Sequence, residues 1–485
     1  MPARCVMVLG TSSGAGKSWL VTALCRWYAR RGLTVAPFKA QNMSNNARVV
    51  AGGEIGSAQY FQALAARAEP DVRMNPLLLK PEGDTRSQLV LLGQVHEALS
   101  RAPWRGRSAS VWPQVAGALD ELRAQNDVLV IEGAGSPAEI NLKDDDIVNM
   151  RTALHAGARC LLVTDIDRGG AFAHLYGTWA LLSQQERTLL RGFVLNKFRG
   201  DPALLAPGPQ QLEGLTGVPT LATLPMWWGH GLPEEDSVFL PSPRREIPGP
   251  REDRGGERTI AIVAYPRISN HDEFQPLFAL PGVRVRWVRE PRDLHGADWI
   301  ILPGSKHTGS DLAWLRSQRL APAIAAHAQR GGAVLGICGG LQMLGEALVD
   351  PHGIDGNGPG LGLLPLVTAF APDKTVRRTQ ARFEQLRGAW RALSGLAVRG
   401  YEIHHGRTAQ HAGMAPAHVA MAGGLAWQHT DGNVLGAYLH GLFEDEAVLR
   451  ALFGSAGSGL DTVFDGLADF VDAHFRPGVL DSLVA

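Results

Sequence analysis

Lysine is scarce in this sequence of 485 residues. Seven of its 47 basic residues are lysine and 40 are arginine, and 47 acidic residues balance them. A net charge of zero leaves no bulk field that would recruit nucleic acid or an anionic membrane. A codon bias toward arginine accounts for the ratio, but not for the places where lysine remains. Those places are positions 17, 39, 80, 143, 197, 306 and 374.

Cysteine is also rare. Cys5, Cys25, Cys160 and Cys338 are far apart, with neither a CxxC pair nor the Cys/His spacing of a zinc site, so a disulfide framework and a zinc site are not expected. The apolar stretch after Arg4 is too short for a signal peptide. No run approaches the roughly 18 apolar residues that span a bilayer. We therefore expect a soluble cytoplasmic protein that binds neither nucleic acid nor membrane.

Short apolar runs alternate with helical stretches, which is typical of buried parallel strands in doubly wound α/β domains. The runs are CVMVLG, TVAPF, DVLVIEG, CLLVTDID, FVLNKF and TLATLP, then TIAIVAY, VRVRWV, DWIILPG and AVLGIC. Residues 241–257 are rich in Pro, Gly and charge, as a linker would be. We predict two α/β domains with mostly parallel sheets, over residues 1–240 and 258–485, the second closed by a helix over 462–475.

The segment GTSSGAGKS follows the first apolar run and opens the first helix, as a phosphate-binding loop does. Its glycines let backbone N–H groups face an anion, and the helix N-terminus and a lysine add positive charge. A strict GxxxxGK[ST] pattern misses it, and the variant spacing resembles the dethiobiotin synthetase type of loop. The predicted ATP-binding residues here are Gly10, Thr11, Gly14, Gly16, Lys17 and Ser18.

Several polar residues follow other predicted strands of the first domain. Glu132 ends the run DVLVI, at the sheet edge where open α/β proteins bind ligands. We predict that Glu132 and Ser18 hold Mg²⁺. Asp165 and Asp167 are weaker candidates for the same region, with a cap or turn role equally open. Asn196 is a candidate contact for adenine or phosphate, with a structural turn as the alternative.

A second site is predicted around Cys338, which stands between the apolar run AVLGI and a helix in GICGGLQMLG. A cysteine at such a turn is a candidate nucleophile, because the helix N-terminus favours the thiolate and small neighbours admit a carbonyl. The turn LPGS places Gly304 where its N–H group, or that of the next residue, would join Gly339 in an oxyanion hole. His440 in YLHG is the predicted base.

The residue that orients His440 stays open. Many Cys amidotransferases place an acid two residues after the histidine, but this sequence has Leu442 there. Glu444 and Glu402 are alternatives, and a backbone carbonyl is a third.

The combination resembles the cobyric acid synthase family over nearly the whole chain. The resemblance rests on GTSSGAGKS, FKAQNMS, EGAGSPAEINL, DIVNM, DIDRGG, LNKFRGD, LPEEDS, PRISNHDEF, ILPGSKHT, GICGGLQMLG, GYEIHHG and YLHGLF. KAQNMS, EGAGSPAEINL and NKFRGD favour this family over the related cobyrinic acid a,c-diamide synthases. The resemblance implies an N-terminal P-loop NTPase-like domain and a C-terminal class I glutamine-amidotransferase-like domain.

The resemblance also implies a reaction. ATP, with Mg²⁺, and glutamine would serve to amidate the b, d, e and g carboxylates of adenosylcobyrinic acid a,c-diamide, giving adenosylcobyric acid. The partners are then small molecules, namely the corrinoid, ATP and glutamine, and a homo-oligomer is left open. Candidate substrate or phosphate contacts are Lys39, Gln41, Asn42, Lys143 and Asp146.

Two other functions are compatible with parts of this sequence. A ParA/MinD-like regulatory ATPase fused to an inactive amidotransferase-like domain would have no use for Cys338. A glutamine-dependent amidase acting on a different polycarboxylate would keep both sites. The scarce lysines favour a synthetase, because four of the seven lie in the segments named above and Lys143 directly follows one, at places where a compact ammonium serves better than a planar guanidinium.

Overall fold

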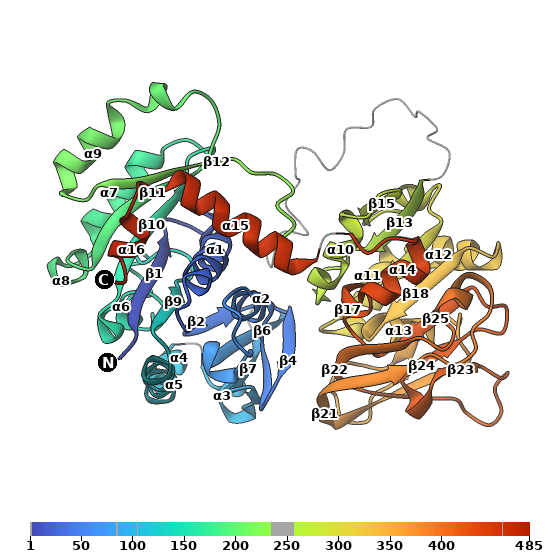
Figure 1. The fold of residues 1–485 in the computed structure, drawn as a ribbon. Helices are drawn as coiled ribbons and strands as arrows, with labels where there is room; N and C mark the ends of the chain where they lie inside the picture. Colours follow the sequence, from blue (N-terminus) through green and yellow to red (C-terminus); the bar gives the residue numbers. More distant parts are fainter. Residues whose placement is uncertain (1, 84–85, 104, 234–256, 458) are drawn as a thin grey trace.

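Six parallel strands organise the first part of the chain in the computed structural model, which describes residues 2–83, 86–103, 105–233, 257–457 and 459–485 (Figure 1). Their order is β12-β11-β10-β1-β9-β2. The bounds are β1 Arg4–Gly10, β2 Val35–Phe38, β9 Val128–Glu132, β10 Arg159–Asp165, β11 Leu190–Phe198 and β12 Thr220–Pro225.

Each of these strands is buried on both faces, which explains their continuous apolar runs. Along β1, Cys5, Met7 and Leu9 belong to one hydrophobic core, while Val6 and Val8 belong to another. The helices of this part are α1 Lys17–Arg30, α5 Trp112–Gln125, α6 Met150–Ala156, α7 Ala171–Leu181, α8 Gln184–Arg187 and α9 Gly208–Thr216.

Between β2 and β9 lies a β-rich insertion that the apolar runs did not predict. It has a sheet in the order β3-β6-β7-β8, a hairpin β4-β5 and helix α2. The bounds are β3 Gln41–Met43, β4 Ala47–Val50, β5 Gly53–Gly56, α2 Ser57–Ala65, β6 Leu77–Gly83, β7 Arg86–Leu91, β8 Gln94–Val95, α3 Glu97–Arg101 and α4 Arg107–Ser110. In Figure 1 the insertion lies on the side of the first part that faces the second, and β4 contacts β21 and β22 there.

The second part contains a seven-stranded sheet in the order β15-β13-β16-β18-β25-β24-β23. The first five strands are parallel, and β24 and β23 continue the sheet as an antiparallel edge. The predicted α/β class with mostly parallel sheets is therefore confirmed. Strand bounds are β13 Arg258–Val263, β15 Val283–Val288, β16 Trp299–Leu302, β18 Ala333–Ile337, β23 His418–Met421, β24 Ala426–Gln428 and β25 Val434–Ala437.

Helices and smaller strands complete this part. The helices are α10 Gln275–Phe278, α11 Thr308–Ser317, α12 Leu320–Gln329, α13 Gly339–Leu344 and α14 Glu446–Phe453. The further strands are β14 Ile268–Ser269, β17 Gly304–Ser305, β19 Ala347–Val349, β20 Gly358–Pro359, β21 Val367–Arg382 and β22 Ala397–Ala409. The predicted linker over 241–257 lies outside the described residues except for its last position.

The C-terminal segment returns to the first part of the chain. Helix α15 Leu460–His474 lies along α1 (Figure 1), and the short α16 Val479–Ser482 follows it. Arg26 of α1 pairs with Asp461 at 2.9 Å and with Asp465 at 2.8 Å. Phe464 and Leu467 enter a core of the first part. A helix does form over the segment that was predicted to close the second domain, but it packs on α1 of the first part instead, because periodicity indicates an apolar face without specifying which element covers it. No helix among the described ranges is long and apolar enough to cross a membrane.

Candidate active site

The predicted phosphate loop joins β1 to α1. It starts at Gly10, the last residue of β1, and α1 begins at Lys17. Gly16 has a φ of 101°, a left-handed conformation that favours glycine. The Lys17 Nζ donates to the carbonyl oxygens of Ser12 at 2.9 Å and Gly135 at 3.2 Å. The loop is thus drawn toward the segment that follows Glu132.

Neighbouring strand ends hold this loop from the other side. Thr11 and Thr164 share a hydroxyl hydrogen bond of 2.9 Å. Asn196 donates to the carbonyl of Ala15 at 2.9 Å, and it lies so close to Gly16 that a Cβ there would meet it at 2.0 Å. Asn196 therefore supports the backbone of the loop.

Two other polar groups at these strand ends also meet the loop. Lys197 donates to the carbonyl of Gly14 at 2.7 Å and pairs with Asp165 at 3.1 Å. Asp167 pairs with Arg199 instead.

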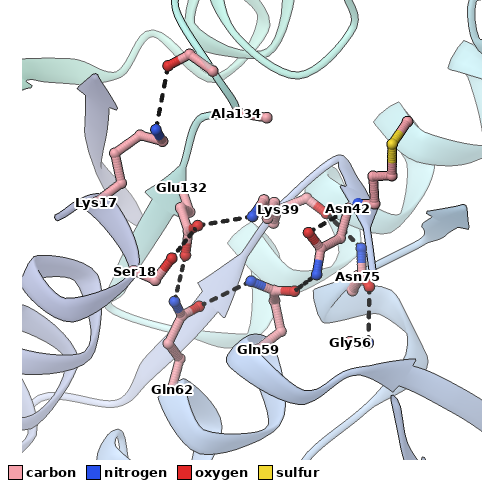
Figure 2. Close-up of polar contacts among 12 residues, drawn as sticks. Lys17, Ser18, Lys39, Asn42, Gly56, Gln59, Gln62, Asn75, Glu132 and Ala134 are labelled. Atoms are coloured by element: carbon pink, nitrogen blue, oxygen red, sulfur yellow. Dashed lines mark hydrogen bonds and ion pairs between the residues drawn. The ribbon is translucent and has the colours of Figure 1, made fainter. Parts of the chain in front are cut away.

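Glu132 is fully buried at the end of β9, and three side chains converge on its carboxylate (Figure 2). The Ser18 hydroxyl and the Lys39 ammonium each donate to Oε1 at 2.8 Å, and Gln62 donates to Oε2 at 2.5 Å. Burial by itself raises the pKa of Glu132, but Lys39, helped by the hydrogen bonds from Gln62 and Ser18, outweighs burial and holds that pKa below its usual range. A buried carboxylate therefore stays ionised beside the phosphate loop.

The predicted nucleophile stands at a strained turn. Cys338 follows β18 with a φ of 52°, a conformation that costs a residue with a side chain about 1–3 kcal/mol and is common at functional sites. Its N–H donates to the carbonyl of Ala437 at 2.7 Å, and its thiol is 3.5 Å from the carbonyl oxygen of Ile403. The pairing of β18 with β25 brings the segment ahead of His440 beside it.

The other predicted residues of this second site lie close by. A Cβ on Gly304 would be 2.9 Å from Cε1 of His440. A Cβ on Gly339 would be 2.7 Å from the backbone nitrogen of Ser305. The structure therefore brings together two glycine turns, the histidine and the cysteine from separate segments.

Sequence reasoning missed the acid beside His440. Glu273, fully buried in the turn His271–Phe274, accepts a hydrogen bond from Nδ1 of His440 at 2.9 Å. Its other oxygen accepts from the N–H of Gly441 at 2.8 Å. Of the two sequence candidates, Glu402 pairs with Arg377 at 2.7 Å and Glu444 pairs with Arg48 at 2.5 Å. The segment PRISNHDEF contains Glu273, but nothing in its sequence links it to a histidine 167 residues later.

The charges around His440 favour its protonated form. Burial alone lowers its pKa, but Glu273 and Cys338 raise it, with a net result of about 10. Because Nδ1 faces Glu273, Nε2 is the ring nitrogen left for Cys338. The arrangement suits a thiolate beside an imidazolium, which is a reactive form of cysteine.

Comparison with known proteins gives the family. The model for the CobQ/CobB/MinD/ParA nucleotide binding domain matches residues 6–227, and that for the CobB/CobQ-like glutamine amidotransferase domain matches residues 259–448. A cobyric acid synthase of Polaromonas sp. (strain JS666 / ATCC BAA-500) is 72% identical over all of this chain and 99% of that protein. A cobyric acid synthase of Variovorax paradoxus (strain S110) is 72% identical over the full length of both. The chain belongs to the cobyric acid synthase family.

Among solved structures, a glutamine amidotransferase matches 43% of this chain and 98% of that chain, with 18% identity and a TM-score of 0.32. Family membership makes the chain an amidating ligase with a nucleotide-binding domain and a glutamine amidotransferase domain. ATP, glutamine and a small-molecule acceptor are the substrates consistent with that family.

The remaining predicted contacts differ in how close they lie to Glu132. Asn42 donates to Gln59 at 3.1 Å, and Gln59 leads through Gln62 to Glu132 (Figure 2). The side-chain oxygen of Gln41 is buried without a hydrogen-bond partner among the described residues.

Asp146 and Lys143 lie further from Glu132. Asp146 accepts from Asn149 at 2.9 Å, and Asn149 in turn bonds the backbone of Ala134, two residues after Glu132. Lys143 pairs with Glu186 of α8 at 3.3 Å instead.

A cavity of about 510 Å³ connects the two parts of the enzyme. Cys338 and Lys306 line it from the second part, and Lys80 and Gln88 from the first. Glu54, fully buried, pairs with Lys80 at 2.6 Å and with Lys374 at 2.5 Å across the boundary.

Burial lowers the pKa of Lys80 to about 7, although Glu54 opposes the shift. Burial, together with the charge of Lys374, also lowers the pKa of Lys306. Three of the seven lysines thus line the cavity at the boundary between the two parts.

Proposed function

We propose that this enzyme converts adenosylcobyrinic acid a,c-diamide to adenosylcobyric acid by amidating the b, d, e and g carboxylates, with ATP, Mg²⁺ and ammonia released from glutamine. The single observation that carries the proposal is the cavity that Cys338 shares with Lys80 and Gln88 of the ATP-binding part. A nitrogen source and a synthetase in one chain serve an amidation, because free ammonia is mostly protonated near neutral pH and a protonated amine is not a nucleophile.

The synthetase half activates the acceptor. A carboxylate is a poor electrophile, and transfer of a phosphoryl group to it forms an acyl phosphate that ammonia attacks with release of phosphate. Lys17 and the loop N–H groups offer positive charge to the phosphates. Ser18 and Glu132 present two hard oxygen donors 2.8 Å apart, which fits Mg²⁺ held by few protein ligands together with phosphate oxygens. When bound, the ion supplies charge neutralisation during the transfer.

The amidotransferase half releases the nitrogen. The Cys338 thiolate attacks the side-chain amide carbon of glutamine, and the proton on His440 passes to the leaving nitrogen as ammonia departs. Water, deprotonated by His440, then cleaves the resulting thioester to glutamate and restores the thiolate. The N–H groups of Gly304 and Gly339 are the proposed donors to the developing oxyanion. Glu273 holds Nδ1 of His440 so that Nε2 serves Cys338.

The test separates nitrogen supply from amide synthesis. Cys338→Ser is expected to lose amidation with glutamine and to recover it with high ammonium, because only the source of nitrogen has been removed. Lys17→Ala is expected to lose amidation with both nitrogen sources. The assay is the mass of the corrinoid product, which falls by one unit for each hydroxyl replaced by an amino group.

Three outcomes would contradict the proposal, each at a different step. Loss of synthesis by Cys338→Ser with both donors would mean that the sites are not separable. Product formation by Lys17→Ala would remove the acyl phosphate step. A corrinoid whose mass does not change with the unaltered protein would mean that the acceptor is a different polycarboxylate.

A further inference from the structure

One arginine of the ATP-binding part is buried against the back of the amidotransferase site. Arg48 lies on β4 and is 1% exposed. Its Nε donates to Asp272 at 3.1 Å, and its Nη2 contacts the same carboxylate oxygen. Its Nη1 lies 2.5 Å from a carboxylate oxygen of Glu444. Both acids belong to the second part, so a single guanidinium crosses the boundary to bind two carboxylates.

Those two acids occupy the segments that hold the catalytic pair. Asp272 directly precedes Glu273 in the turn His271–Phe274. Glu444 ends the turn Leu442–Glu444, which begins two residues after His440. Glu273 binds both His440 and the N–H of Gly441. Because the guanidinium joins the two turns, it also bears on the position of Glu273 relative to the His440 ring.

Tyr401 lies between Arg48 and His440 and contacts both. The guanidinium carbon of Arg48 lies 5.2 Å from the centre of the Tyr401 ring. That ring stacks on His440 with centroids 5.2 Å apart and an interplanar angle of 16°. The backbones of Tyr401 and His440 are also hydrogen-bonded in both directions. The imidazole is therefore held on its face as well as at Nδ1.

The neighbours of Arg48 hold the same turn. The N–H of Ala47 donates to the side-chain oxygen of Asn270 at 2.9 Å. The N–H of His271 donates to the side-chain oxygen of Asn46 at 3.2 Å. Three successive residues ahead of Glu273 are thus bound by the β4 segment, all through buried or part-buried hydrogen bonds.

We propose that Arg48 of the ATP-binding part is a positioning residue for glutamine hydrolysis, and that this hydrolysis needs the two parts docked. The inference rests on the proposed function, in which Cys338 and His440 hydrolyse glutamine. A planar guanidinium suits this place, because it satisfies two carboxylates in one plane and its burial is tolerated only with such partners. Without it, two uncompensated carboxylates lie beside Glu273.

The test compares two arginines at one boundary. Arg48→Met is expected to lower kcat for glutamine hydrolysis about tenfold or more, with KM for glutamine within about threefold, because a misplaced base slows chemistry more than binding. Arg378→Met is the matched control. Arg378 donates to the carbonyl of Val49, next to Arg48 on β4, and pairs with the exposed Glu69. Its loss leaves the Glu273 segment untouched, so its kcat is expected to stay within about twofold.

A charge-balanced rescue distinguishes positioning from general damage. Arg48→Met combined with Glu444→Gln removes one of the two stranded carboxylates and is expected to regain at least about threefold in kcat over Arg48→Met alone. Ammonium-supported amidation is expected to stay within about threefold in every variant, because the synthetase site makes no use of the base. Asp272→Asn keeps the shape of the side chain and is expected to lower kcat for glutamine hydrolysis severalfold. This variant replaces Arg48→Met in the test if Arg48→Met does not fold.

Unchanged kcat in Arg48→Met, or an equal fall of ammonium-supported amidation, would overturn the inference. If Arg48→Met does not fold, an unchanged kcat in Asp272→Asn would overturn it. A double variant whose kcat is no higher than that of Arg48→Met would also overturn it. Absence of glutamine hydrolysis in the unaltered protein would instead refute the proposed function, so the two failures are distinguishable.

Discussion

Replacing Glu273 by Gln tests the orientation of the base most directly. The change keeps the size of a fully buried side chain and removes its charge. An amide cannot serve both of the present partners. With its oxygen on the N–H of Gly441, its NH₂ group faces Nδ1 of His440, and the histidine proton must then sit on Nε2, where it cannot accept the proton of the Cys338 thiol.

The expected magnitude follows from the contact that is lost. A buried hydrogen bond to a charged group contributes about 1.5–3 kcal/mol, which corresponds to roughly 10- to 100-fold in rate. The unfavourable tautomer adds to this loss. We therefore expect kcat for glutamine hydrolysis to fall about 100-fold or more, while amidation with ammonium stays within about threefold.

The pH profile gives a second readout with a definite sign. In the unaltered enzyme burial lowers the pKa of His440, but Glu273 and Cys338 together raise it, to about 10. Without the charge of Glu273 less opposes the lowering by burial, so His440 loses its proton at a lower pH. The alkaline limb of kcat/KM for glutamine is therefore expected to move to lower pH in Glu273→Gln.

Glutamate release measured between acid and alkaline pH provides the assay, and Glu402→Gln provides the control. Glu402 is a buried carboxylate of the same sheet region that binds Arg377 and Thr379 rather than His440. The reasoning is refuted if Glu273→Gln keeps kcat within about threefold, or if Glu402→Gln shows the larger loss and the alkaline shift.

Two further predictions concern lysines and their partners. Lys39→Arg is expected to lower the rate of amidation about tenfold with either nitrogen source, because the guanidinium of arginine is larger than the ammonium of lysine and does not fit the buried space beside Glu132. In Lys143→Arg, at a half-exposed site, the rate of amidation is expected to stay within about twofold of the unaltered enzyme. Equal losses in the two variants, measured as amidated product, would contradict the claim that Lys39 needs a compact ammonium. Glu54→Gln leaves the buried Lys80 and the part-buried Lys374 without their shared carboxylate and is expected to lower the free energy of unfolding by about 3–5 kcal/mol, against less than about 1 kcal/mol for the exposed Glu69→Gln. Denaturant titrations measure this difference, and equal midpoints would contradict it.

Much of the fold could be predicted because each strand of the large sheets comes from one contiguous apolar run of the sequence. Each apolar run quoted from the sequence is a strand of one of the two large sheets. The insertion between β2 and β9 was not predicted, and four of its six strands have four residues or fewer. Such strands exist through their partners and carry no periodic signal of their own. Likewise, the pattern of α15 indicates a buried face, but only the structure places that face on α1.

The candidate sites divide in the same way. The phosphate loop and the Cys338 turn are each made by a few successive residues, so backbone geometry and residue type are enough to predict them. Glu132 was predicted because the ends of parallel strands meet at one edge of a sheet. The structure adds Lys39, which directly follows the neighbouring parallel strand β2, and Gln62 of α2, which lies outside that pattern.

Two α/β parts, a loop suited to phosphate and a cysteine suited to nucleophilic attack follow from the order of the residues alone. The contact of Glu273 with His440, and the ion pairs of Arg48 beside them, are visible only in the folded chain. The physical reason is that a local motif needs only the covalent order of the chain, whereas an ion pair between distant segments depends on how whole sheets pack. Sequence spacing carries no information about that packing.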